Sequence, residues 1–208
     1  MCIRDRGIDK IQKYASLFGL DQKSGVEIEE MDPHVSDTDA VRSSIGQGTN
    51  NYAPVQLARY VTTIANEGNC YDLTLVNEIK NIDGRTVYKS DNVPKNTVDL
   101  TDSQWAVIKQ GMRQMVSEHT SPSALINQIN VNVAGKTGTA EEDTTRPDHA
   151  LFVSFAPYEN PEVSVTCVIP HGYTSGNAEE LAGMVYAYMY DPDKLDTLDI
   201  TGNNQMSD

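Results

Sequence analysis

The sequence predicts one α+β domain in which helices pack against an antiparallel sheet. Between residues 8 and 118, apolar residues recur at spacings of three and four, which is typical of helices with one buried face. Three runs rich in β-branched and aromatic residues follow, at 131–140, 150–156 and 163–169. Their connecting loops are too short and polar to hold a crossover helix, so the strands should be antiparallel neighbours. Helices, then adjacent strands, then a covering helix form the pattern of an α+β domain.

The composition is that of a folded protein with a strongly negative charge. The chain has 208 residues, 38% of them hydrophobic, which is enough to bury a core. Its 16 Lys and Arg against 30 Asp and Glu give a net charge of −14, which repels phosphate backbones and argues against a nucleic-acid partner. No window approaches the roughly 18 consecutive apolar residues of a membrane span, and the N-terminus lacks the apolar core of a signal peptide. If the protein is exported, we expect that the exporting segment is not in this chain.

The first element is expected to be a helix over residues 8–18. Residues 1–6, MCIRDR, look like a translated adapter leader and are set aside from the fold. Gly19 follows the helix in a position that favours a left-handed cap. The apolar face of this helix consists of Ile8, Ile11, Ala15 and Phe18. Because the chain opens in mid-helix, we interpret it as a truncated domain.

A long structured loop is expected over 21–51, because Gly, Pro, Asp, Ser and Asn are abundant there and periodicity is weak. Loops of this length in compact domains are commonly functional. Its segment Ser44-Ile-Gly-Gln-Gly48 is interpreted as a structural turn that needs small residues and a buried amide. A helix should then begin at Pro54 and stop at Gly68. Alternating residues over 73–89, around Asp83-Gly84, predict a hairpin.

Two further helices are predicted, one before and one after the three strands. Thr101 and Gln104 have the spacing of a capping box, and the helix that they begin should run to about Glu118. The last helix is expected over 177–190, with an apolar stripe formed by Leu181, Met184, Val185 and Tyr188. The acidic residues 191–208 have little to bury, and we expect them to be a disordered tail.

Cysteine and histidine patterns favour no metal site and no disulfide framework. Cys70 and Cys167 are expected to be free thiols rather than a bridge, because residues so far apart in sequence pair only if the fold happens to juxtapose them. The histidines show no metal-ligand spacing and are interpreted as ordinary surface or loop residues, at positions His34, His119, His149 and His171. No cofactor is expected.

The stretch that carries chemical information is Gly135-Lys136-Thr137-Gly138-Thr139. One interpretation is a phosphate loop, but the Walker signature needs a glycine where the chain has Asn130, and it must open a helix. The other is the Lys-Thr-Gly element of serine acyl-transferases that form penicilloyl adducts, which lies on an edge strand beside the active site. An ordinary surface strand is the third interpretation, and the flanking sequence argues against it.

Each residue type in this element has a physical role to play. Lys136 supplies a positive charge where a substrate carboxylate and a developing oxyanion need one. Gly138 has no side chain and lets a substrate backbone approach the strand. Thr137 and Thr139 offer hydroxyl donors, and a strand edge offers unpaired amides to an extended peptide. These four residues are the candidate substrate-binding set, with Lys136 and Thr139 also the candidate catalytic residues.

The context of this element resembles the transpeptidase domain of class B penicillin-binding proteins. Gly135-Lys-Thr-Gly-Thr-Ala-Glu141 is followed by His149-Ala-Leu-Phe-Val-Ser-Phe-Ala-Pro157, and Ser44-Ile-Gly-Gln-Gly48 is followed by Pro54-Val-Gln-Leu-Ala58. The resemblance covers residue 7 to about residue 190, in the family's order. It implies a penicillin-binding, transpeptidase-like α+β fold that is incomplete at the N-terminus, with residues 7–190 forming the C-terminal part of the domain.

The resemblance also implies a function in the bacterial cell wall. A family serine attacks the D-Ala-D-Ala bond of a peptidoglycan stem peptide, an amine of a neighbouring stem resolves the acyl-enzyme, and β-lactams mimic the dipeptide and inhibit. By this resemblance, the Thr139 N–H would be an oxyanion-hole donor. The hydroxyls of Thr137 and Thr139 would bind the substrate carboxylate, and Lys136 would stabilise charge. The parent protein would act at the extracytoplasmic face of the membrane, anchored by an upstream helix, with other cell-wall synthesis proteins as partners.

The chain departs from the family pattern at the nucleophile. No serine is followed three residues later by lysine, and Ser175-Gly-Asn177, which has the form of the second motif, lies after Lys136 at an expected helix start. We therefore expect this fragment alone to be inactive. The alternatives that remain are a fragment of a β-lactam sensor or serine β-lactamase, and a non-catalytic interaction domain.

Overall fold

The molecule is built around an antiparallel sheet. The computed structural model describes residues 7–91 and 93–195. Within these residues the main sheet has the order β5-β6-β7, from β5 (Ala134–Ala140), β6 (His149–Ala156) and β7 (Val163–Ile169). Both pairs are antiparallel. The predicted α+β class and the three neighbouring strands are confirmed.

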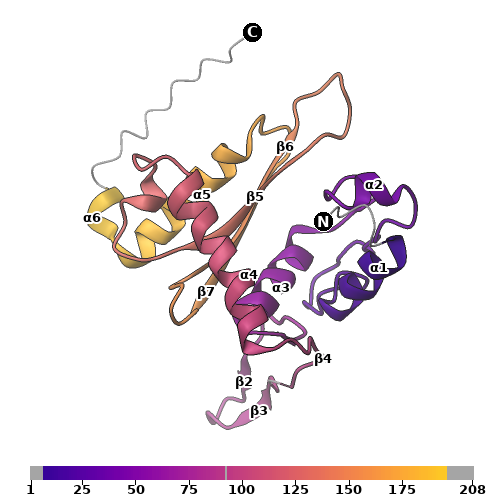
Figure 1. The fold of residues 1–208 in the computed structure, drawn as a ribbon. Helices are drawn as coiled ribbons and strands as arrows, with labels where there is room; N and C mark the ends of the chain where they lie inside the picture. Colours follow the sequence, from indigo (N-terminus) through magenta and orange to yellow (C-terminus); the bar gives the residue numbers. More distant parts are fainter. Residues whose placement is uncertain (1–6, 92, 196–208) are drawn as a thin grey trace.

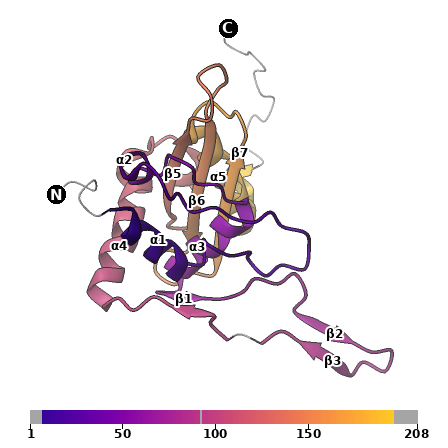
Figure 2. The ribbon, with the colours of Figure 1, turned by 90° about the vertical axis from the view of Figure 1, so that its right-hand side faces the viewer.

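Helices cover both faces of this sheet (Figure 1, Figure 2). Helix α5 (Ser175–Tyr190) lies on one face, and α3 (Pro54–Ala65) lies on the other. Helix α4 (Asp102–Gln114) packs beside β5 and continues as a π-helical turn over Met115–His119. The predicted helices at 54–68 and 101–118 are therefore confirmed, with slightly different ends.

The sheet separates two hydrophobic cores. Alternate residues of a strand point to opposite faces, so neighbouring positions of β6 contribute to different cores. The core on the α3 side contains Val61, Ile64, Met112, Ala134 and Phe155. The core on the α5 side contains Val116, Ile126, Ile129, Val133, Ala150, Phe152, Ala156, Cys167, Ala178, Ala182, Tyr186 and Ala187. The free thiols expected at Cys70 and Cys167 are confirmed, and both are buried.

The predicted apolar stripe of the last helix is wrong. Of the expected set, Leu181 is 46% exposed and Tyr188 is 74% exposed. The face of α5 that packs on the sheet consists of Ala178, Ala182, Tyr186 and Ala187, all fully buried. Small side chains let the helix approach the strands closely, and the Tyr186 hydroxyl lies 3.0 Å from Ser154 Oγ. Because α5 is apolar around most of its surface, hydrophobicity alone did not select the packed face.

The N-terminal segment confirms the first predicted helix. Helix α1 (Ile8–Leu17) has Phe18 as its C-cap residue, and Gly19 follows with a φ of 73°, the left-handed conformation that glycine favours after a helix. Leu20 N–H closes this cap by donating to Ala15 O at 2.8 Å. The expected loop over 21–51 is mostly irregular, and it contains one short helix that was not predicted, α2 (Ala40–Ser43).

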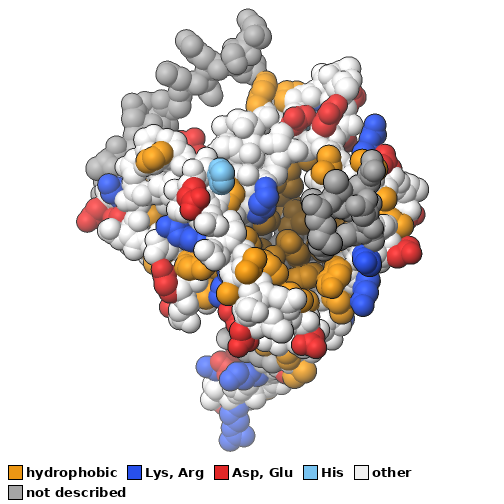
Figure 3. Space-filling model, in the orientation of Figure 1, with side chains coloured by type: hydrophobic (Ala, Val, Ile, Leu, Met, Phe, Trp, Pro, Cys, Tyr) orange, Lys and Arg blue, Asp and Glu red, His pale blue; other side chains and the backbone are white. Residues whose placement is uncertain are grey.

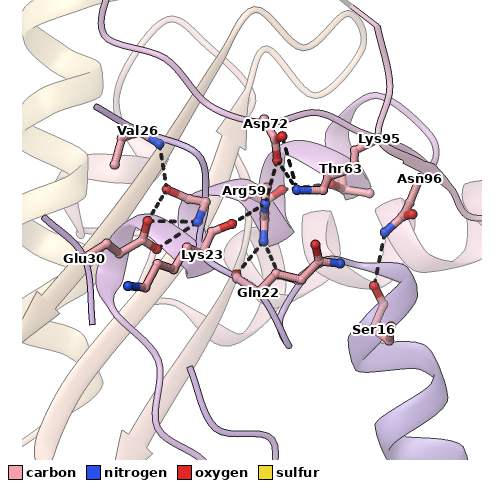
Figure 4. Close-up of polar contacts among 12 residues, drawn as sticks. Ser16, Gln22, Lys23, Val26, Glu30, Arg59, Thr63, Asp72, Lys95 and Asn96 are labelled. Atoms are coloured by element: carbon pink, nitrogen blue, oxygen red, sulfur yellow. Dashed lines mark hydrogen bonds and ion pairs between the residues drawn. The ribbon is translucent and has the colours of Figure 1, made fainter. Parts of the chain in front are cut away.

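A buried arginine fastens this N-terminal segment to α3 (Figure 4). The side chain of Arg59 is 1% exposed, and its guanidinium donates to the carbonyls of Lys23 at 2.8 Å and Gln22 at 2.7 Å, and to that of Gly19. It also pairs with Asp72 at 3.2 Å. Four acceptors from two separate segments therefore meet on one side chain.

The remaining strands lie outside the main sheet. The predicted hairpin is confirmed as β2 (Glu78–Lys80) and β3 (Thr86–Lys89), with a shorter first strand than expected. It projects from the body of the molecule, with every strand residue exposed (Figure 2). Strands β1 (Asn69–Cys70) and β4 (Asn96–Thr97) form a second pair. A 3₁₀ helix spans Leu125–Asn127.

The predicted disordered tail begins too early. Asp191 is 8% exposed and accepts a hydrogen bond from Asn130 N–H at 3.2 Å, and Pro192–Leu195 forms helix α6. Leu195 packs against the core on the α5 side, which explains why these residues fold. The rest of the predicted tail, and the adapter-like residues 1–6, lie outside the described residues. Among the described helices, none has both the length and the apolar character needed to cross a bilayer.

Candidate functional site

The candidate site is the edge strand β5. Residues 135–139 lie inside this seven-residue strand, and β6 is its neighbour in the main sheet. The motif therefore forms a strand at a sheet edge, as expected, and does not open a helix as a phosphate loop must. An edge strand presents N–H and C=O groups that an extended peptide can pair with.

The register of β5 places the motif's side chains on two faces. Lys136 lies opposite Val153 and Gly138 opposite Leu151, so these two positions share the face on which α3 packs. Thr137 lies on the other face, where its hydroxyl is 3.9 Å from Met115 Sδ. Lys136 is exposed, and its ammonium group donates to the Thr137 carbonyl at 2.8 Å.

The two glycines of the motif have different surroundings. A Cβ at Gly135 would lie 2.5 Å from the Phe152 ring, so this glycine is required by packing within the sheet. A Cβ at Gly138 would lie 3.5 Å from Leu151 Cβ, an ordinary contact. The fold itself therefore does not require a glycine at 138, which leaves close approach of a ligand as a reason for its presence.

A large apolar cavity opens on the face of the sheet that carries Lys136. Its volume is about 780 Å³, and it lies between the N-terminal helix and the end of the sheet at which β5 stops and β6 begins. Figure 3 shows this side of the molecule hollowed and lined with hydrophobic side chains. Its lining includes Tyr14, Phe18, Tyr60, Ala140, Leu151 and Val168. Lys136 itself does not line it, so the cavity adjoins the C-terminal end of β5 rather than the charged part of the motif.

The glycine-rich turn before α3 holds the C-terminal extension of β5. The amide of Gln47 pairs with the Glu141 backbone, accepting from its N–H at 3.1 Å and donating to its carbonyl at 3.3 Å. Gly46 and Gly48 flank it with φ of 86° and 94°, values that favour glycine. The structural interpretation of this turn is supported, and the fold reveals that it supports the motif strand. Sequence reasoning did not identify Gln47 as a neighbour of β5.

The serines with motif-like spacing lie elsewhere. Ser175 begins α5, with Thr174 as the N-cap residue, as its position at an expected helix start indicated. A second string of this form is Ser90-Asp-Asn92. Ser90 directly follows β3 on the projecting hairpin, and its N–H donates to Asn77 O. Ser175 begins the helix that packs on the face of the sheet opposite Lys136, and Ser90 lies on the projecting hairpin.

Comparisons with known proteins agree with this architecture. The chain matches the family described as the penicillin binding protein transpeptidase domain over residues 4–188. It is 29% identical to penicillin-binding protein 2B of Streptococcus pneumoniae, covering 80% of this chain and 27% of that protein. It is 26% identical to the peptidoglycan D,D-transpeptidase MrdA of Acinetobacter baumannii, covering 88% of this chain and 31% of that protein.

A solved structure with the same fold is that of penicillin-binding protein A from M. tuberculosis, determined as an imipenem acyl-enzyme complex. The TM-score is 0.75 at 25% identity, covering 87% of this chain and 42% of that one. This chain spans about a third of the length of the curated relatives it matches. The edge strand, the helices on both faces of the sheet and the match along most of the sequence lead to one conclusion: the chain belongs to the transpeptidase-domain family of class B penicillin-binding proteins.

Proposed function

We propose that this chain is the C-terminal part of a D,D-transpeptidase domain that cross-links peptidoglycan stem peptides by serine acyl transfer. The observation that carries the proposal is the position of Lys136, Thr137, Gly138 and Thr139 on an edge strand of an antiparallel sheet. Relatives that are named peptidoglycan D,D-transpeptidases support it.

In this proposal, β5 binds the stem peptide as an added strand. The Thr139 N–H donates to the oxyanion of the tetrahedral intermediate, and the hydroxyls of Thr137 and Thr139 bind the terminal carboxylate. Lys136 stabilises the negative charge that develops. A donor aimed at such an oxyanion typically contributes about 10²–10³ in rate. Gly138 keeps the edge open to the peptide backbone.

The chemistry requires a serine and a base in the Ser-x-x-Lys pattern, and this chain has no serine followed three residues later by lysine. The serine oxygen attacks the carbonyl between the two D-alanines, the C–N bond breaks, and free D-alanine leaves with the serine proton. An amine of a neighbouring stem then attacks the ester, forms the cross-link and regenerates the serine. We propose that the nucleophile and its base are encoded upstream, so that this chain alone is inactive.

The same edge would bind β-lactams, because their strained amide and carboxylate imitate the D-alanyl dipeptide. The structure of a relative as an imipenem acyl-enzyme complex supports this. We place the parent protein at the extracytoplasmic face of the bacterial membrane, where its substrate lies, with other cell-wall synthesis proteins as partners. The proposed membrane anchor would be encoded upstream.

Labelling with a fluorescent penicillin tests this proposal. We expect no covalent label on the chain alone. A chimera that joins the upstream half of the transpeptidase domain of Streptococcus pneumoniae penicillin-binding protein 2B to residues 7–195 should be labelled. Lys136→Ala should slow its labelling by about 100-fold or more, whereas Lys89→Ala, on the exposed hairpin, should leave the rate unchanged. A folded chimera that takes no label, or labels equally fast without Lys136, would overturn the proposal.

A further inference from the structure

Three possible metal ligands meet where the loop after β5 returns to the sheet. Glu142 follows β5, His149 begins β6, and His171 follows β7. Each offers one ligand atom, and these atoms lie within 4.8 Å of one another. We propose that these three side chains bind a zinc ion and leave its fourth coordination position open. This inference does not depend on the proposed transpeptidase function.

The spacing is close to that of a formed site. His149 Nε2 lies 3.2 Å from Glu142 Oε2. Two ligand atoms at about 2.0–2.2 Å from a tetrahedral zinc are roughly 3.3 Å apart, so this pair already has the required separation. The rings of His149 and His171 lie beside each other, with centroids 4.9 Å apart and planes inclined by 37°. Glu142 is exposed and both histidines are partly exposed, so their side chains are able to adjust around an ion.

A hydrogen bond orients His171 for coordination. Its Nδ1 lies 3.1 Å from the carbonyl oxygen of Pro147, which can only accept, so Nδ1 carries the proton. The lone pair of Nε2 is then available to a metal. A metal-binding imidazole usually has such a partner on its second nitrogen, which fixes the tautomer and the direction of the ring.

The hydrogen bonds of His149 show which of its ring nitrogens carries the proton. Its Nδ1 accepts from the His171 N–H at 3.1 Å, so in the metal-free site its proton is on Nε2 and is donated to Glu142. When zinc binds Nε2, this proton leaves and a proton is taken up at Nδ1, so the ring stays neutral. The ring then gives up its hydrogen bonds with the His171 N–H and with Glu142, and the coordinate bond to zinc replaces them.

The donor set suits zinc better than magnesium or calcium. Two imidazoles and one carboxylate, with a fourth position open, are a common arrangement for zinc, which tolerates distorted geometry because its d shell is full. Magnesium and calcium prefer oxygen ligands throughout. Glu141 and Asp143 flank Glu142, and the chain's net charge is −14, so the field at this loop attracts a cation.

Zinc would fix the loop 141–148 to the sheet. His149 pairs with Ala140, the last residue of β5, so the ion would lie at one end of the candidate site's strand. Glu142 is then held by the metal on one side of the loop, while the Gln47 amide holds Glu141 from the other. The proposed ion therefore orders the segment that follows the motif.

Calorimetric titration of the untagged, chelator-treated chain with zinc chloride tests this site. We expect one ion per chain and, by ligand linkage, a melting temperature that rises with zinc concentration. His171→Asn suits the test because His171 has a φ of 53°, which asparagine tolerates. This variant and Glu142→Gln should each weaken zinc binding by about 10-fold or more.

His119→Ala is the matched control, because His119 ends the π-helical turn and is not in this cluster. It should bind zinc like the wild type, and magnesium should not compete. The inference is wrong if the wild-type chain binds no zinc, if iron(II) binds and zinc does not, or if binding survives both ligand substitutions undiminished. If His171→Asn fails to fold, Glu142→Gln on the exposed loop still decides the question.

Discussion

At the level of single residues, the two glycines of the motif differ in how closely their neighbours pack around them. Gly135 is closed in by the Phe152 ring, whereas Gly138 has room for a methyl group. Packing within the sheet therefore requires the glycine at 135 and does not require the glycine at 138.

We predict that Gly135→Ala lowers the free energy of unfolding by about 1–3 kcal/mol, because the added methyl overlaps the Phe152 ring. Gly138→Ala should stay within about 0.5 kcal/mol of the wild type. Urea denaturation of the two variants measures both values. Equal losses for the pair would show that the strand does not have the packing described for it.

Glu179 is a buried carboxylate on the first turns of α5. It is 8% exposed, and burial raises its pKa above the ordinary 4.5, although a hydrogen bond from the Thr120 hydroxyl opposes the shift. When a carboxyl has a higher pKa in the folded state than in the unfolded state, the folded protein is more stable with that carboxyl protonated. Its contribution to stability therefore falls as the pH rises through 4.5 and then through the higher folded value.

We predict that Glu179→Gln raises the melting temperature at pH 7, and that this gain shrinks as the pH is lowered to 4.5 and below. Glu180→Gln, which removes an exposed charge from the same helix, controls for the change in net charge. Melting curves across this range measure the difference from wild type. A gain that is constant with pH would contradict the raised pKa.

At the scale of elements, local signals predicted helix ends better than buried faces. The Thr101 hydroxyl accepts from Gln104 N–H, and the Gln104 side chain accepts from Thr101 N–H, as the capping box indicated. Gly19 closes α1 for a similar local reason. The packed face of α5 depends instead on which side chains fit between the helix and distant strands, and neighbours in sequence do not carry that information.

Arg59 is the clearest connection between elements, because it lies on α3 and binds carbonyls of the segment after α1 (Figure 4). We predict that Arg59→Ala lowers the free energy of unfolding by about 3 kcal/mol, since several buried acceptors lose their donor. Arg42→Ala is the control, because Arg42 is exposed and pairs with Asp39 at 3.4 Å. It should cost less than about 0.5 kcal/mol.

Chemical denaturation of both arginine variants supplies these values. A cost below about 1 kcal/mol for Arg59→Ala would mean that the N-terminal segment is held to α3 by its apolar contacts rather than by the guanidinium.

At the scale of the whole molecule, the candidate site was only partly predictable. Residues 135–139 are contiguous, so their composition alone predicted an edge strand with the features of an acyl-transferase, and the edge strand is confirmed. Gln47 lies far from Glu141 in sequence, and His149 and His171 are joined only because β6 and β7 are antiparallel neighbours. Residues that become neighbours only through tertiary structure have no characteristic spacing in the sequence from which their contact could be predicted.

The sheet also provides the framework on which the proposed binding residues of β5 are arranged. The proposed binding residues lie on one edge strand, helices pack on both faces of the sheet, and the apolar cavity lies on the face that carries Lys136. The relatives that this chain matches are about three times longer. We propose that β5 contributes substrate binding and charge stabilisation, and that the nucleophile lies outside this chain.

The most direct test of the proposed role of β5 is a crystal structure of the penicillin-acylated chimera described above. The measured quantity is the distance from the acyl carbonyl oxygen to the backbone nitrogen of Thr139. We expect about 2.7–3.1 Å, with the penicillin carboxylate bound by the Thr137 and Thr139 hydroxyls. A carbonyl oxygen beyond hydrogen-bond reach of β5, with the carboxylate directed away from both threonines, would contradict it.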